Sequence, residues 1–135
     1  MFATITTSAA LAGAGLWLRR RATRRWARAV ADYPPTGRLV EVNGTVVHAH
    51  TEGTGPDLVL IHGASGNSRD FTMSLIPALK DRYRVTAFDR PGLGWSGRAA
   101  PGLDRALTRA AESPAAQAAT LQAAADRLGL RRPVV

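Results

Sequence analysis

The sequence predicts an α/β fold, an open sheet that begins with an antiparallel hairpin and continues with parallel strands and helices. Three observations predict it. Asn43-Gly44, the strongest short hairpin signal, separates two apolar runs. The continuous apolar run 58–61 is typical of a strand covered on both faces. After this run, segments with helical spacing alternate with further strands, as they do in α/β proteins.

The elements follow in the order strand, strand, strand, helix, strand, loop, helix. We expect strands over 39–42, 46–50, 58–61 and 83–88, and a helix over 71–79, where apolar residues recur at helical spacing. Ser113-Pro114 is typical of a helix start, the alanine-rich stretch to Leu128 favours helix, and Gly129 suits its end. Residues 98–112 lack periodicity and predict a loop, and 133–135 resemble the opening of another buried strand.

Composition and charge exclude several classes of protein. With 135 residues the chain holds one domain at most, and the absence of cysteine excludes a disulfide scaffold, a thiolate nucleophile and a Cys-ligated metal site. Six of the 18 basic residues lie in the short stretch 19–28, whereas 12 basic and ten acidic residues are nearly balanced from Asp32 onward. The net charge of +8 therefore has a local origin, and nucleic-acid binding is the least favoured explanation of it.

The first 31 residues predict a transmembrane or membrane-associated helix with a basic flank. Residues 2–18 form a run of 17 without charge, near the lower limit for a spanning helix, and arginines follow it. This charge order predicts a single-pass protein with its body in the cytoplasm and membrane lipid as a partner. A peripheral amphipathic helix, a transit peptide and a cleaved signal remain alternatives. Residues 32–37, with Pro34-Pro35, predict a stiff linker, and 38–135 predict the α/β domain.

Two loops that directly follow apolar strands concentrate the polar chemistry. They are His62–Asn67 and Asp89–Ser96, and in open α/β sheets ligands bind beyond the carboxyl ends of strands. Gly63 and Gly66 allow a sharp turn that aims backbone N–H groups into a pocket, where such donors stabilise an oxyanion. His62 is a candidate base, although a histidine in this position more often orders its loop. Asp89-Arg90 suggests a local ion pair, with a turn directly after it.

Two further motifs in these loops are weak. Ser65 and Ser96 each lie in a Gly-x-Ser-Gly string, whereas a nucleophile elbow needs Gly-x-Ser-x-Gly, so we reject both as nucleophiles. Residues 92–97 match the dinucleotide fingerprint Gly-x-Gly-x-x-Gly. That fingerprint should open a helix directly after a strand and have an acidic residue about 20 positions later. Here three residues intervene after the strand and no acid has that spacing, which favours a simple glycine turn.

Taken together, the hairpin, the His-Gly-x-x-Gly loop and the Asp-Arg-Pro-Gly-x-Gly-x-Ser loop resemble the early landmarks of the α/β-hydrolase family. The resemblance covers residues 38–135, the N-terminal part of such a domain, and ends just before the nucleophile elbow. It implies that Ala64 gives a backbone N–H to the oxyanion hole and that Ser65 is a neighbouring pocket residue. It implies structural roles for the other motif residues: His62, Gly63, Gly66, Asp89, Arg90, Pro91, Gly92, Gly94 and Ser96.

The resemblance and the N-terminal helix together predict a membrane-anchored serine hydrolase, esterase-like, acting on a small-molecule or lipid-like substrate without cofactor, metal or nucleic acid. None of the catalytic triad is present, and the nucleophile, the acid and the histidine are expected beyond Val135. We therefore expect the 135-residue chain alone to be inactive. Two other functions remain open, a non-catalytic anchored α/β binding module and a nucleotide-binding domain that uses residues 92–97.

Overall fold

The computed structural model describes residues 3–99 and 112–135. The chain divides into two compact units, Met1–Pro35 and Thr36–Val135. Most of the predicted loop 98–112 lies outside the described residues. The predicted boundaries, which separate a helical segment over 1–31, a linker over 32–37 and an α/β domain over 38–135, remain a prediction.

The N-terminal unit is built around one helix, α1 (Ala3–Asp32), which is 30 residues long. The prediction that this helix crosses a membrane is wrong, and the single-pass localisation is wrong with it. Over the described parts of the chain, none of the helices combines the length and the apolar character that a membrane span requires. The physical reason is composition: the uncharged run contains threonines, a serine and glycines, and a span of about 20 residues has to include arginines.

The second unit contains a four-stranded mixed sheet, which confirms the predicted α/β class. The strands are β1 (Arg38–Val42), β2 (Thr45–Glu52), β3 (Asp57–Ile61) and β4 (Arg84–Phe88), in the spatial order β1-β2-β4-β3. The β1–β2 and β2–β4 pairs are antiparallel, and β3–β4 is parallel. The hairpin turn is where the sequence predicts it, because Asn43 and Gly44 both adopt positive φ angles, 51° and 75°.

Among the described residues of this unit, three helices accompany the sheet: α2 (Arg69–Thr72), α3 (Leu75–Leu79) and α4 (Pro114–Arg127). The predicted single helix over 71–79 is two short helices instead. The chain leaves helical geometry at Ser74, where φ is −137°, and the helical spacing of the apolar residues does not reveal this break. The predicted start of α4 is confirmed, since the Ser113 hydroxyl accepts a hydrogen bond from the Ala116 N–H and proline follows it.

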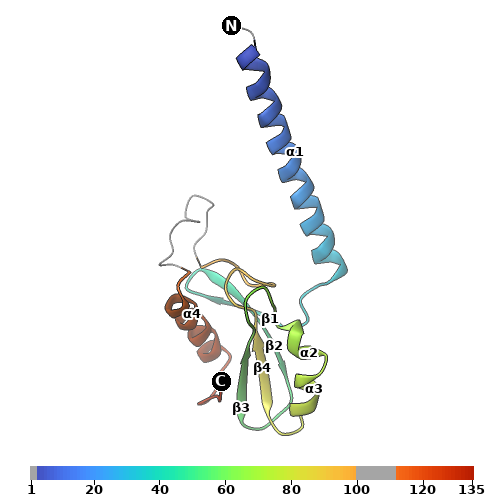
Figure 1. Cartoon of the computed structure of the whole chain (residues 1–135). Helices are drawn as coiled ribbons and strands as arrows, with labels where there is room; N and C mark the ends of the chain where they lie inside the picture. Colours follow the sequence, from blue (N-terminus) through green and yellow to red (C-terminus); the bar gives the residue numbers. More distant parts are fainter. Residues whose placement is uncertain (1–2, 100–111) are drawn as a thin grey trace. The chain divides into compact units, whose positions relative to one another are not determined.

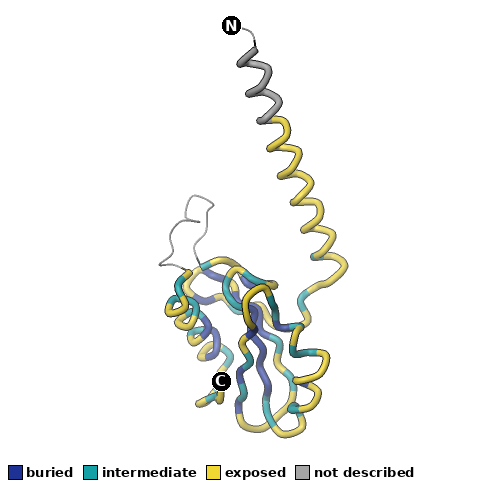
Figure 2. Tube along the Cα trace, viewed as in Figure 1, coloured by how far each residue is buried: buried dark blue, intermediate teal, exposed yellow. Residues whose placement is uncertain are grey.

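Each face of the sheet is covered by helices (Figure 1). On one face Leu121, Ala124 and Ala125 of α4 pack against a cluster that includes Val47 and Phe88. On the other face Ile76 of α3 packs against buried residues of β4 and half-buried residues of β3. Figure 2 shows the buried residues gathered along the strands and along one side of α4. This layering explains why residues 58–61 are all apolar rather than alternating.

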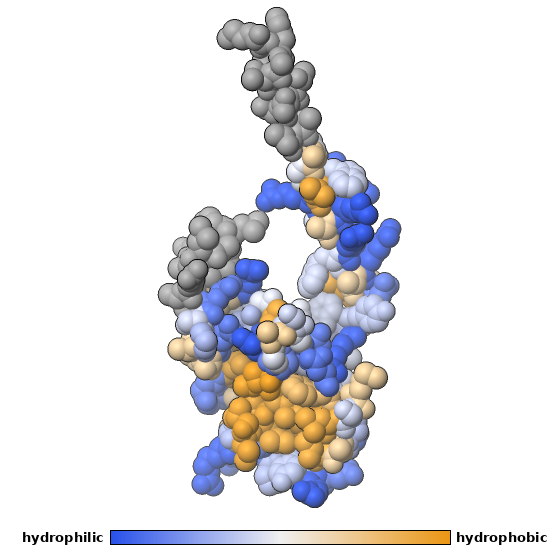
Figure 3. Space-filling model, viewed as in Figure 1, coloured by the Kyte–Doolittle hydropathy of each residue, from blue (hydrophilic) through white to orange (hydrophobic). Residues whose placement is uncertain are grey.

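The edge of the sheet formed by β3 remains partly uncovered. The face seen in Figure 3 carries a patch of apolar residues over β3. Ile61 is 42% exposed there, and Val134 and Val135 are 63% and 80% exposed. A shallow groove at this edge is lined by Val59, Ile61, Phe88, Ala118, Leu121, Gln122, Ala125, Pro133 and Val135.

Candidate active site

The loop after β3 is tied to the loop after β4 through His62. This side chain is buried, and its Nε2 accepts a hydrogen bond from the Arg90 N–H at 3.0 Å. Its Nδ1 therefore carries the proton and donates to the Gly63 carbonyl at 2.8 Å. Both ring nitrogens are occupied by backbone groups, so His62 holds two loops together and has no free nitrogen with which to act as a base.

The tip of the same loop presents backbone to solvent. Gly63, Ala64 and Ser65 are exposed, and Ser65 adopts a left-handed conformation with φ of 63°. Gly66 lies so close to the Asp70 carboxylate that a Cβ would collide with it. Within residues 3–99 and 112–135, no group accepts a hydrogen bond from the Ala64 N–H. The turn thus leaves a backbone donor available at the carboxyl end of a parallel strand, which is where the resemblance expects the oxyanion hole.

Behind this loop lies a buried polar network centred on Asp89, which is fully buried at the end of β4. Its Oδ2 accepts hydrogen bonds from His48 Nδ1 at 2.9 Å and from the Trp95 N–H at 2.8 Å. Its Oδ1 accepts from the Ser68 N–H at 2.6 Å. One carboxylate therefore joins β2, the segment that leads into α2, and the loop after β4.

Ser96 completes the network from the other side. Its hydroxyl donates to the Asp89 carbonyl at 2.6 Å and accepts from the His48 N–H at 2.9 Å. With both hydroxyl roles used and the side chain buried, Ser96 is a structural residue of the loop. Its position explains why the segment 89–96 ends in serine.

The burial of Asp89 disfavours its charged form, and this is the largest single influence on its pKa. The hydrogen bonds from His48, Trp95 and Ser68 together outweigh burial and lower the pKa of Asp89 to about 2. The carboxylate is thus ionised at neutral pH. Both of its oxygens accept hydrogen bonds from the surrounding segments, as expected of an anion with a structural role.

Ser68, His48 and Asp89 are the residue types of a catalytic triad, but their geometry is not that of one. In a triad the serine and the acid bind opposite nitrogens of the histidine. Here the Ser68 hydroxyl, at 3.5 Å, and Asp89 both approach Nδ1, while Nε2 accepts from the Gly37 N–H at 3.2 Å. All three side chains are also buried. These three residues therefore form a buried structural network that a substrate cannot reach.

Arg90 does not form the local ion pair that its position beside Asp89 suggests. Its Nε donates to the Gln117 side chain of α4 at 3.0 Å, whereas Asp89 turns inward to His48. That interpretation of the sequence is wrong because adjacent residues at the end of a strand point to opposite faces of the sheet. His48 is the partner that sequence reasoning missed. The only signal for it was a histidine between the apolar residues Val47 and Ala49 of the predicted strand.

Residues 91–97 form a closed turn. Gly92 and Gly94 have positive φ angles of 81° and 52°, and Pro91 precedes them. The Gly92 N–H donates to the Gly97 carbonyl, and the Gly97 N–H donates to Val46 of β2. None of the described residues 92–99 is helical. The segment therefore lacks the helix N-terminus on which the dinucleotide fingerprint depends.

The segment after α4 returns to the edge of β3. Val134 forms a parallel bridge with Leu58, with Val59 N–H to Val134 O at 2.8 Å and Val134 N–H to Asp57 O at 3.0 Å. The Asp57 carboxylate accepts hydrogen bonds from the Arg84 guanidinium and from the Arg131 N–H. These bonds fix the direction of residues 133–135, which run beside β3 toward the end that carries the Ala64 loop.

The model of the alpha/beta hydrolase family matches residues 58–135, more than half of the chain. The chain belongs to the alpha/beta hydrolase family. This match confirms the resemblance inferred from the motifs of the sequence. Clusters of histidine, aspartate or glutamate able to hold a metal ion are absent from the described residues.

Two curated relatives are similar to parts of this chain. A zearalenone hydrolase of Bionectria ochroleuca is 39% identical over 59 residues, which cover 44% of this chain and 22% of the relative. A pimeloyl-[acyl-carrier protein] methyl ester esterase of Aeromonas hydrophila subsp. hydrophila is 50% identical over 42 residues, 31% of this chain and 16% of that enzyme. The chain thus matches less than a quarter of the length of either relative.

Solved structures agree with the fold. A meta-cleavage product hydrolase superposes with a TM-score of 0.56 and 27% identity over 69% of this chain and 32% of its own. A membrane phospholipase A superposes with a TM-score of 0.57 and 24% identity over 96% of this chain and 40% of its own, and so includes most of α1. At this identity the second likeness concerns the fold alone.

Proposed function

We propose that the hydrolase acts on a small or lipid-like ester by serine acyl transfer, and that the loop 62–66 supplies its oxyanion hole. The observation that carries the proposal is the exposed Ala64 N–H, which lacks an acceptor among the described residues and lies at the carboxyl end of β3. A preorganised backbone donor of this kind stabilises the negative charge of a tetrahedral intermediate. Ser65, next to it and equally exposed, would contact the substrate.

In this proposal the nucleophile follows Val135. The bridge between Leu58 and Val134 supports it, because residues that continued this strand would pass β3 and reach the Ala64 loop. A serine on a sharp turn directly after that strand would lie near the Ala64 N–H, at the same end of the sheet. The 135-residue chain alone would then hold a donor without a nucleophile, and we propose that it is inactive by itself.

An ester is the substrate class that the relatives support best. One is a methyl ester esterase and the other a zearalenone hydrolase. Serine acyl transfer would proceed by attack of the serine oxygen on the ester carbonyl, expulsion of the alcohol, and hydrolysis of the acyl-enzyme by water. The Ala64 N–H would donate to the carbonyl oxygen in both tetrahedral intermediates.

The test compares two substitutions at one position in a protein that extends beyond Val135 with its own coding sequence. Ala64→Pro removes the N–H, whereas Ala64→Gly retains it and serves as the matched control. We expect kcat for p-nitrophenyl butyrate to fall roughly 10²–10³-fold in Ala64→Pro, with a small change in KM, and to stay near the parent value in Ala64→Gly. Thermal unfolding of both variants separates this effect from misfolding.

Fluorophosphonate labelling tests the nucleophile separately. The extended protein should be labelled at one serine after Val135, and the 135-residue chain should not be labelled. Labelling of a serine within the 135 residues, or equal kcat values in both Ala64 variants that fold, would contradict the proposal. Saturable partner binding by an extended protein that no fluorophosphonate labels would favour the non-catalytic module instead.

A further inference from the structure

The helix α1 carries a concentration of positive charge that the hydrolase fold does not use. All six arginines that precede Asp32 lie between Arg19 and Arg28, with no acidic residue before Asp32. Residues 13–29 are all exposed, so the charges lie on the surface of the helix. A charge run of this kind needs an occupant of opposite charge or remains solvated.

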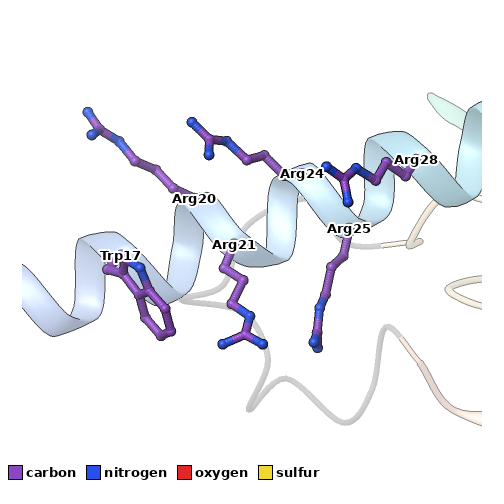
Figure 4. Close-up of a pocket in the computed structure, with 6 residues that line it drawn as sticks. All are labelled: Trp17, Arg20, Arg21, Arg24, Arg25 and Arg28. Carbon is purple, nitrogen blue, oxygen red and sulfur yellow. The ribbon is translucent and has the colours of Figure 1, made fainter.

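Five of the six arginines lie within an arc of about 140° around the helix, and Arg19 lies outside it. Arg20, Arg24 and Arg28 succeed one another at a spacing of four, and Arg21 and Arg25 lie beside them; we call these five residues the basic face. Together with Trp17 they line a shallow surface hollow, in which Arg20 and Arg24 point to one side and Trp17, Arg21 and Arg25 to the other (Figure 4). The Arg21 guanidinium stacks on Trp17 at 5.1 Å from the ring centroid.

The opposite side of the same segment carries three apolar residues, with Arg19 at its margin about 20° from Trp26. Leu18, Ala22 and Trp26 also succeed one another at a spacing of four, two positions before the arginines, which places them about 200° around the helix. We call these three residues the apolar face. Leu18 is 58% exposed and Trp26 60% exposed. The segment 17–28 is therefore a basic amphipathic helix.

Two opposed faces favour one class of occupant. An RNA or DNA strand offers phosphates to the basic face but leaves the apolar face in water. An anionic lipid surface satisfies both, because arginines bind lipid phosphates while leucine and tryptophan enter the boundary between headgroups and acyl chains. We propose that α1 binds the surface of anionic phospholipid membranes as a peripheral helix, through the basic and apolar faces of residues 17–28. This binding is independent of the proposed esterase activity.

Vesicle sedimentation with the 135-residue chain tests the proposal. We expect the chain to sediment with vesicles of phosphatidylcholine and phosphatidylglycerol, to stay in solution with phosphatidylcholine alone, and to be released by sodium chloride. In the variant Arg20→Gln, Arg24→Gln, Arg28→Gln the affinity should fall roughly a hundredfold, about fivefold for each charge. A matched control, Arg38→Gln, Arg127→Gln, Arg132→Gln, removes the same charge from exposed positions of the second unit and should bind as the parent does.

A second variant addresses the apolar face. Leu18→Gln with Trp26→Gln keeps every charge and should weaken vesicle binding about tenfold, since it removes two side chains from the boundary region. The proposal would be overturned if the chain failed to bind anionic vesicles. It would also be overturned if both arginine variants lost the same affinity, or if the Leu18 and Trp26 changes had no effect on binding. Tighter binding to poly(U) than to the vesicles at the same salt would overturn it in favour of a nucleic-acid surface.

Discussion

At the level of single residues, the Asp89 carboxylate accepts hydrogen bonds from three separate segments of the domain. Asp89→Asn would place an amide NH₂ against donors in either orientation, because His48 and Trp95 donate to one oxygen and Ser68 to the other. We expect a loss of about 3–5 kcal/mol in the free energy of unfolding, measured in urea. Asp81→Asn, at an exposed aspartate, is the control and should change it by less than about 0.5 kcal/mol.

The same carboxylate predicts a pH dependence of stability. Its pKa of about 2 in the folded chain lies below the unfolded value of about 3.9, so the folded state binds fewer protons. The stabilisation is complete above about pH 4 and is lost as the pH falls from 4 toward 2, roughly 2–3 kcal/mol in all. Unfolding measured across this range should show a slope in the parent that Asp89→Asn reduces. An unchanged slope would contradict the role assigned to Asp89.

Gly94 shows how close packing, rather than backbone angle alone, determines a residue. Gly94 and Gly44 both have positive φ, but a Cβ at Gly94 would collide with the Asp89 carboxylate, whereas one at Gly44 meets open space. Gly44→Ala should cost about 1 kcal/mol through its backbone alone. Gly94→Ala should cost at least about 2 kcal/mol more, because it displaces a buried anion. Equal melting temperatures of the two variants would argue against this explanation.

Among the elements, β3 depends on Asp57 for its attachment to the segment after α4. The hydrogen bonds from Arg84 are the main reason that the pKa of Asp57 is lowered, and the Arg131 N–H adds to them. Asp57→Asn should destabilise the domain by about 2–3 kcal/mol. Hydrogen exchange should quicken at Val59 and Val134 more than at Ala87, in the middle of β4. Glu41→Gln, at an exposed position of β1, is the control, and uniform quickening would contradict a local role.

The elements also show which sequence signals are sufficient. The hairpin was predictable because Asn43 and Gly44 adopt positive φ at low cost whatever surrounds them. The start of α4 was predictable because serine and proline satisfy local backbone groups. The break at Ser74 was not, since α2 and α3 keep the apolar spacing of one helix and differ only in backbone geometry. The membrane span over α1 was predicted from an uncharged run whose threonines, glycines and adjoining arginines leave it insufficiently apolar.

For the whole molecule, the exposed edge of β3 predicts self-association of the 135-residue chain. Within the described part of the chain, β3 has β4 on one side and a single bridge, to Val134, on the other. Open edges with apolar side chains pair with other chains. Ile61→Lys should shift sedimentation velocity profiles toward monomer at high protein concentration. Val46→Lys, on the interior strand β2, is the control; an equal shift in both variants would contradict association through β3.

The amino-acid sequence by itself determined the order of strands and helices, the turns and the family, because each depends on residues close together in the chain. It also located the two loops that carry the candidate site. Only the tertiary structure decided that Asp89 pairs with His48 rather than Arg90, and that Ala64 presents a backbone donor that no described residue uses. The physical reason is sequence separation: His48 and Asp89 are 41 residues apart. Their contact exists only once β2 and β4 pair, and no local propensity encodes that pairing.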